Sequence, residues 1–161
     1  DRIKILPQNI ETTISKVETA GKEVDQVFAP QPAVIHIEDD IDISRGDYFV
    51  HADQMPTVSN EFQALVCWMD HKELSAGNKY FLQHRSKVIK AMVKEIDYQL
   101  DVNTLEKTPI TNSVKLNEVV RVTLKTASPL VFDAFEKNKG TGSAILIDET
   151  SNATVGAVMI L

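Results

Sequence analysis

Long hydrophobic runs are missing from this sequence of 161 residues. A helix needs about 20 consecutive, mostly apolar residues to cross a membrane, and no segment comes close, so we expect no membrane-spanning helix. A disulfide bond within the chain is excluded because Cys67 is the only cysteine. It lies in the apolar stretch 65–69, which predicts a buried, reduced thiol in a cytoplasmic protein.

Basic residues are outnumbered. Lysine and arginine total 17 against 23 aspartates and glutamates, which gives a net charge of −6. Such a surface repels phosphate backbones and disfavours a nucleic-acid partner. The hydrophobic share of 43% is ordinary for a soluble globular protein and excludes a disordered chain. The length suffices for one large domain or two small ones.

Motifs for nucleotide binding and catalysis are also missing. No G-x-x-x-x-G-K-[ST] segment occurs, so the chain lacks the backbone cradle and the lysine that hold a triphosphate. Residues 139–143 are rich in glycine, but no lysine or helix pattern follows them, which predicts a turn. Neither G-x-S-x-G nor H-E-x-x-H is present. We therefore predict no catalytic residue, and an independent enzyme or a small-ligand barrel is the least favoured hypothesis.

Metal ligands are not indicated either. The four histidines are His36, His51, His71 and His84. Their spacing fits no usual zinc motif, so we expect structural histidines on strands and turns. The acidic segment 38–42 lacks the spacing and the glycine of a calcium-binding EF-hand loop and is predicted to be a solvated loop. No metal and no cofactor is therefore predicted for this chain.

The dominant hydrophobic period is two. Short alternating runs separated by Gly, Pro, Asn or Asp predict antiparallel strands. The expected strands are residues 2–6, 13–17, 33–37, 48–50, 61–69, 79–84, 87–96, 119–125, 143–148 and 153–160. The lysine spacing in 87–96 would also fit a helix, but its β-branched residues favour a strand. Ser151 and Asn152 are predicted to form the turn of the last hairpin.

Residues 52–57 have the composition of a linker, since they are polar and include Pro56, which a central strand would reject. We therefore predict two domains, 1–55 and 56–161. The expected fold is all-β, with two antiparallel β-barrels of which the first is partial. The abrupt first strand and the apolar end suggest a piece of a longer protein.

Several segments resemble one protein family. They are residues 41–47 with their Ser-Arg-Gly-Asp turn, 60–64, 98–106, 116–122, 132–135 and 142–156. Residues 41–47, 60–64 and 142–156 resemble the second and third domains of translation-factor GTPases, where 41–47 stands at the end of the second domain. Residues 98–106, together with 116–122 and 132–135, are similar to the large, GTPase subunit of bacterial sulfate adenylyltransferase and are not typical of elongation factors. The family's nucleotide-binding first domain has no counterpart in this chain.

The resemblance implies a function. In this family the large subunit hydrolyses GTP while its small catalytic partner joins ATP and sulfate into adenylyl sulfate. GTP and Mg²⁺ would bind to the missing domain, and the two barrels would serve domain coupling and subunit docking. Candidate contacts with these partners are Arg45 and Asp47 in one turn and Asp101 and Asn103 in another. Each could instead be purely structural, Arg45 by pairing with Asp47 and Asn103 by forming an Asx turn. The alternative function is an elongation-factor-type pair of barrels that binds aminoacyl-tRNA or another RNA.

Overall fold

The computed structural model describes residues 1–110 and 113–161, and this part of the chain contains twelve strands and no helix. The strands are β1 (Arg2–Leu6), β2 (Ile10–Thr19), β3 (Lys22–Val24), β4 (Val34–Ile37), β5 (Tyr48–His51), β6 (Thr57–Trp68), β7 (Lys79–His84), β8 (Lys87–Leu100), β9 (Lys107–Thr108), β10 (Val119–Phe132), β11 (Ser143–Ile147) and β12 (Thr154–Ile160). The all-β class is confirmed. In the same residues no helix is present that could cross a membrane. Two compact units can be distinguished, Asp1–Met55 and Pro56–Leu161.

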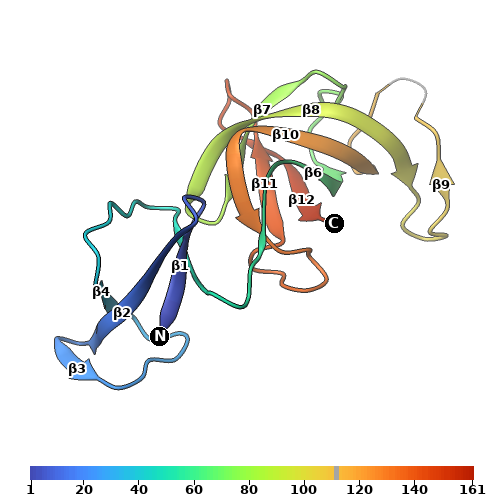
Figure 1. Cartoon of the computed structure of the whole chain (residues 1–161). Coiled ribbons are helices and arrows are strands. Elements are labelled where there is room, and N and C mark those ends of the chain that lie inside the picture. Colours follow the sequence, from blue (N-terminus) through green and yellow to red (C-terminus); the bar gives the residue numbers. More distant parts are fainter. Residues whose placement is uncertain (111–112) are drawn as a thin grey trace. The chain divides into compact units, whose positions relative to one another are not determined.

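The first unit is an antiparallel sheet with the order β3-β2-β1-β5, in which β4 also pairs with β2 (Figure 1). Burial alternates along β1 as the sequence predicts, whereas β4 is exposed at Val34, Ile35 and His36 in succession. Ile3 and Ile5 are buried on one face of β1. On the other face, Arg2 and Lys4 form ion pairs of 2.7 and 3.2 Å with Glu11 on β2. Within residues 1–55 the recorded pairings form an open sheet rather than a closed ring.

The second unit is a closed barrel. Its strands follow the order β10-β6-β12-β11-β7-β8, and β8 pairs back onto β10, so that six strands complete a ring. The short strand β9 pairs antiparallel with the end of β8. Figure 1 shows β8 and β10 as the two long, curved strands of this barrel. Every strand of the ring has a neighbour on both sides, which removes free sheet edges.

The barrel core is built from alternate residues of these strands. On β6 the buried side chains are Phe62, Ala64, Val66 and Trp68. Trp68 is fully buried, its Nε1 donates a 2.9 Å hydrogen bond to the carbonyl of Lys72, and its ring meets Tyr80 edge-on at 5.5 Å. The polar tip of the indole is therefore satisfied at the end of the core.

The segment 87–96 is a strand, as its β-branched residues indicated, and not a helix. Ile89, Ala91 and Val93 are buried in alternation with exposed or half-exposed neighbours, which is a period of two. The strand runs past the predicted end to Leu100. Its pairing with β10 shifts register twice, which marks two β-bulges and bends the strand around the barrel.

The strand β10 also continues beyond the predicted end at residue 125, through a sequence that contains Pro129. The register with β6 jumps from Lys125 opposite Glu61 to Leu130 opposite Ser59. Pro129 lies inside this wide bulge, where its missing N–H interrupts no ladder hydrogen bond. Alternation alone could not show that the strand resumes after the bulge.

Two short strands, β3 and β9, were not predicted. They contain three and two residues, too few to display a period. The predicted linker 52–57 ends one residue late, because β6 begins at Thr57, directly after Pro56.

Candidate partner-binding surfaces

The first pair of predicted contact residues lies in the turn before β5. The Asp47 carboxylate accepts hydrogen bonds from the Ser44 backbone at 2.8 Å and from the Gln8 side chain at 3.0 Å, and the Asp47 amide donates to the Ser44 carbonyl. Gly46 supplies the left-handed conformation with φ 101°. Asp47 therefore holds the turn. Arg45 is exposed, and within the described residues no ion pair joins it to Asp47, so the alternative of a purely structural Arg45–Asp47 pair does not occur.

The second pair lies at the tip of the hairpin between β8 and β9, residues 101–106, which we call the hairpin tip. Asp101 Oδ1 accepts hydrogen bonds from the amides of Asn103 at 2.8 Å and Thr104 at 3.1 Å, and these bonds lower the pKa of Asp101. The Asp101 carbonyl accepts a hydrogen bond from the Leu105 amide, and the Asp101 amide donates one to the Glu106 carbonyl. Asp101, rather than the Asn103 side chain, is thus the residue that forms the Asx turn.

This closed loop presents two apolar side chains to solvent. Val102 is 63% exposed and Leu105 is 70% exposed. Leu105 also adopts a φ of 61°, which a residue with a branched side chain rarely does. Strained backbone of this kind gathers at functional positions. The sequence interpretation missed both residues, although two apolar side chains in a polar turn were a visible signal.

A cationic cluster supports the base of the hairpin tip. The Tyr98 ring lies 5.0 Å from Lys107 Nζ and 5.8 Å from Arg121 Cζ. Arg121 also donates to Gln63 on β6 and lies 3.4 Å from the Asp97 carboxylate. The hydrogen bond from Arg121 is the main cause that lowers the pKa of Tyr98. Residues from four strands, β6, β8, β9 and β10, therefore meet at the base of the hairpin on the outer face of the barrel.

Each pair of predicted contact residues lies within one turn, and a hydrogen bond joins Asn103 to Asp101, whereas no interaction joins Arg45 to Asp47 in the described residues. The first pair belongs to the first unit and the second pair to the barrel. Their role as partner contacts stays a prediction.

The glycine-rich segment 139–143 forms a turn, as predicted, and it covers a buried histidine. His84 is 1% exposed, and its Nε2 lies 2.7 Å from the carbonyl of Thr141. The Thr141 hydroxyl in turn donates to Asp133 at 2.7 Å. Burial lowers the pKa of His84. The side chain is therefore a neutral part of the packed barrel end.

His84 should make barrel stability depend on pH. Its ordinary pKa is 6.5 and the folded value is lower, so the unfolded chain takes up the proton first as the pH falls. The free energy of unfolding should be fully retained above pH 6.5 and should decline below it. Urea unfolding followed by Trp68 fluorescence at a series of pH values measures this. His84→Gln should flatten the decline, whereas the exposed-histidine variant His71→Gln should keep it. An unchanged pH profile in His84→Gln would contradict the assignment.

Comparison with known proteins places the barrel in a family. Residues 61–161 match the family model described as GTP-eEF1A C-terminal domain-like. Two solved structures share the fold. Sup35 complexed with GDP aligns with a TM-score of 0.87 at 15% identity, over 100% of this chain and 40% of that one. Apo elongation factor SelB from Methanococcus maripaludis aligns with a TM-score of 0.75 at 16% identity, over 99% and 35%.

The curated relatives are more similar in sequence. A protein from Mycobacterium tuberculosis named bifunctional enzyme CysN/CysC is 40% identical over 100% of this chain and 26% of its own length. Sulfate adenylyltransferase subunit 1 from Teredinibacter turnerae is 38% identical over 100% and 34%, and that from Bacteroides fragilis is 36% identical over 100% and 34%. The chain thus spans about a quarter to a third of the length of these relatives. It belongs to the GTP-eEF1A C-terminal domain-like family and is homologous over its whole length to part of sulfate adenylyltransferase subunit 1.

Proposed function

We propose that this chain forms the two β-domains that follow the GTPase domain of a cytoplasmic sulfate adenylyltransferase subunit 1. The observation that carries the proposal is the 36–40% identity across the entire chain to proteins of that name and to CysN/CysC. The parent protein would couple GTP hydrolysis to the formation of adenylyl sulfate from ATP and sulfate. GTP and Mg²⁺ would bind in the GTPase domain, because no position in this chain matches a phosphate loop.

The architecture suits a coupling role. Each strand of the ring is hydrogen-bonded on both sides, and the core around Trp68 is closely packed. A body of this kind moves as a unit and transmits a displacement without deforming, which is how domain-level switches operate. The hairpin tip is anchored on this body and presents its apolar side chains outward. It is the surface that we assign to docking of the small catalytic subunit.

An assay of the longer protein that carries this chain tests the function directly. Together with its small subunit it should convert ATP and sulfate into adenylyl sulfate, and the product should increase when GTP is hydrolysed. Absence of adenylyl sulfate under these conditions would refute the proposal. Calorimetric titration of GTP into the 161-residue chain alone should give no binding heat, since the nucleotide site lies in another domain.

Removing the apolar side chains of the hairpin tip should weaken docking. Val102→Ser combined with Leu105→Asn keeps the turn, because asparagine tolerates a positive φ. We expect the dissociation constant for the small subunit to rise by about tenfold or more, as for loss of a buried anchor at an interface. Isothermal calorimetry measures this. The matched control is Val88→Ser, which replaces an apolar side chain that is 56% exposed and lies on β8, away from the hairpin tip. Equal affinities of both variants for the small subunit would argue against the hairpin tip as the docking surface.

The alternative, binding of aminoacyl-tRNA, rests on the fold shared with translation factors, and identities of 15–16% show the fold alone. The net charge disfavours RNA binding by the first unit, which contains five basic and eleven acidic residues. The net charge does not disfavour RNA binding by the barrel, which contains twelve basic and twelve acidic residues. Filter binding of tRNA at two salt concentrations decides between the functions, because salt-sensitive retention would favour the alternative.

A further inference from the structure

The outer face of the barrel carries a groove that neither the homology nor the proposed docking tip explains. Its volume is about 300 Å³. We call it the lysine groove, and its lining residues are Lys79, Lys90, Ala91, Met92, Lys125, Thr126 and Ala127. They come from β7, β8 and the bulged part of β10, which the ring closure brings side by side.

Strand register explains the arrangement. Met92 on β8 lies directly opposite Lys79 on β7 and directly opposite Lys125 on β10. Lys90 projects from the same face two residues before Met92, and its Nζ lies 6.0 Å above the Phe81 ring. Since neighbouring strands are about 4.8 Å apart, the backbones of Lys79 and Lys125 are roughly 10 Å apart. Three lysines therefore line a groove together with the apolar residues Ala91, Met92 and Ala127.

The positive charge of the groove is not neutralised by a salt bridge within the described residues, where Lys79, Lys90 and Lys125 form no ion pair. The nearest carboxylate in the cross-strand row is Glu61, opposite Lys125. Glu61 is held instead by Lys94 at 2.6 Å, and this hydrogen bond keeps the pKa of Glu61 below its usual value while Lys125 contributes a weaker attraction.

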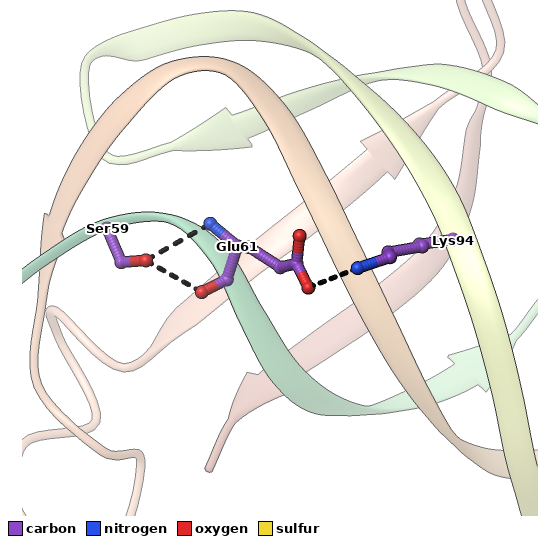
Figure 2. A network of polar contacts seen from close by, with 3 residues as sticks. All are labelled: Ser59, Glu61 and Lys94. Atoms are coloured by element: carbon purple, nitrogen blue, oxygen red, sulfur yellow. Dashed lines mark hydrogen bonds and ion pairs between the residues drawn. The ribbon is translucent and has the colours of Figure 1, made fainter.

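Figure 2 shows how this carboxylate is fixed. Lys94 extends from β8 across β10 to reach Glu61 on β6. The Ser59 hydroxyl donates to the Glu61 carbonyl at 2.7 Å and accepts its amide at 3.1 Å, so the backbone is fixed as well. Lys94 thus forms the ion pair with Glu61, and none of the three groove lysines does so in the described residues.

We propose that the lysine groove binds an extended acidic segment of a partner protein, with carboxylates on either side of one apolar side chain. In an extended chain, side chains two residues apart point the same way and are about 7 Å apart. A pattern of acid, any residue, apolar, any residue, acid would set the apolar group over Met92 and a carboxylate toward the lysines on each side. Lysine ammonium groups attract carboxylates and phosphates alike, but the groove also contains the apolar residues Ala91, Met92 and Ala127, which favour a peptide with an apolar side chain over a phosphate backbone.

The test uses the whole 161-residue chain and a defined probe. The probe is a fluorescein-labelled peptide of five residues with glutamate at both ends, leucine in the centre and serine between, and its binding is followed by anisotropy. Lys79→Gln combined with Lys90→Gln and Lys125→Gln should raise the dissociation constant by about tenfold. The corresponding triple arginine variant should restore binding, because the charge returns.

A matched control makes the same change in net charge elsewhere on the barrel. Its substitutions at exposed lysines are Lys115→Gln, Lys137→Gln and Lys139→Gln. The control should bind the probe as the unmodified chain does, and a peptide with leucine replaced by serine should bind more weakly than the probe. Thermal melts of all variants should coincide.

Three outcomes would overturn the proposal. Equal weakening of probe binding in the groove glutamine variant and in the control variant would show that the probe binds only by general charge attraction. Tighter binding of a single-stranded oligonucleotide through the same three lysines would point to nucleic acid. Self-association that the groove variant abolishes, seen by light scattering, would identify a second copy of the chain as the occupant. None of these results depends on GTP or adenylyl sulfate, so the proposal stands or falls independently of the proposed function.

Discussion

Replacing Gly142 with alanine is expected to lower the free energy of unfolding of the barrel by about 3 kcal/mol or more. An added Cβ would lie 2.4 Å from Phe135 Cα, 2.5 Å from its backbone nitrogen and 2.8 Å from the Asn138 carbonyl oxygen. All of these are backbone atoms, so no side chain can rotate away. The Gly142 amide donates to Asn138 and its carbonyl accepts the Ile160 amide at 2.8 Å, which ties the turn to β12. The whole end of the barrel would have to shift.

Urea unfolding followed by fluorescence measures the effect, because Trp68 is the only tryptophan and reports on the barrel. Gly140→Ala is the matched control, two residues away in the same turn. There the added Cβ would meet only the ends of the Arg85 and Asn138 side chains, at 3.2 and 3.3 Å. We expect a loss of about 1 kcal/mol or less at this position. A Gly142→Ala variant as stable as the control would show that the turn can relax.

The second large effect is expected at Trp68. Trp68→Ala should destabilise the barrel by about 4 kcal/mol, because it leaves a cavity in the core and removes the edge-on contact with Tyr80 at 5.5 Å. It also leaves the Lys72 carbonyl without the indole hydrogen bond of 2.9 Å. Urea unfolding followed by far-ultraviolet circular dichroism measures the loss, since the variant has no tryptophan.

A conservative variant separates packing from hydrogen bonding. Trp68→Phe keeps most of the buried ring and loses the Nε1 donor, so we expect a cost of about 2 kcal/mol. Equal destabilisation by Trp68→Phe and Trp68→Ala would mean that the bond to the Lys72 carbonyl, and not the packing, dominates.

The strands could be predicted where alternation is clean and turns are marked. Residues 143–148 and 153–160 correspond to β11 and β12, and the predicted turn residues Ser151 and Asn152 lie in the connection between them, where Asn152 adopts a left-handed φ of 57°. The ambiguous segment 87–96 was resolved correctly by its β-branched residues. The predicted strand 119–125 is shorter than β10 because the bulge around Pro129 interrupts the two-residue hydrophobic period. The strand β9 has two residues and is too short to show such a period.

The candidate sites were predicted less completely. Asp47 and Asp101 were selected, and both prove to organise turns through carboxylate hydrogen bonds. The exposed Val102 and Leu105 beside Asp101 were overlooked. Exposure depends on what the rest of the chain covers, which local composition does not reveal.

The amino-acid sequence alone determined the all-β class, most strand positions and the family, because alternation, turn residues and motif order are properties of neighbouring residues. Only the tertiary structure decided that β8 closes onto β10, that Gly142 lies against the Phe135 backbone, and that Lys79, Lys90 and Lys125 share one groove. These features depend on register between strands distant in the chain, and register is selected by packing of the entire core.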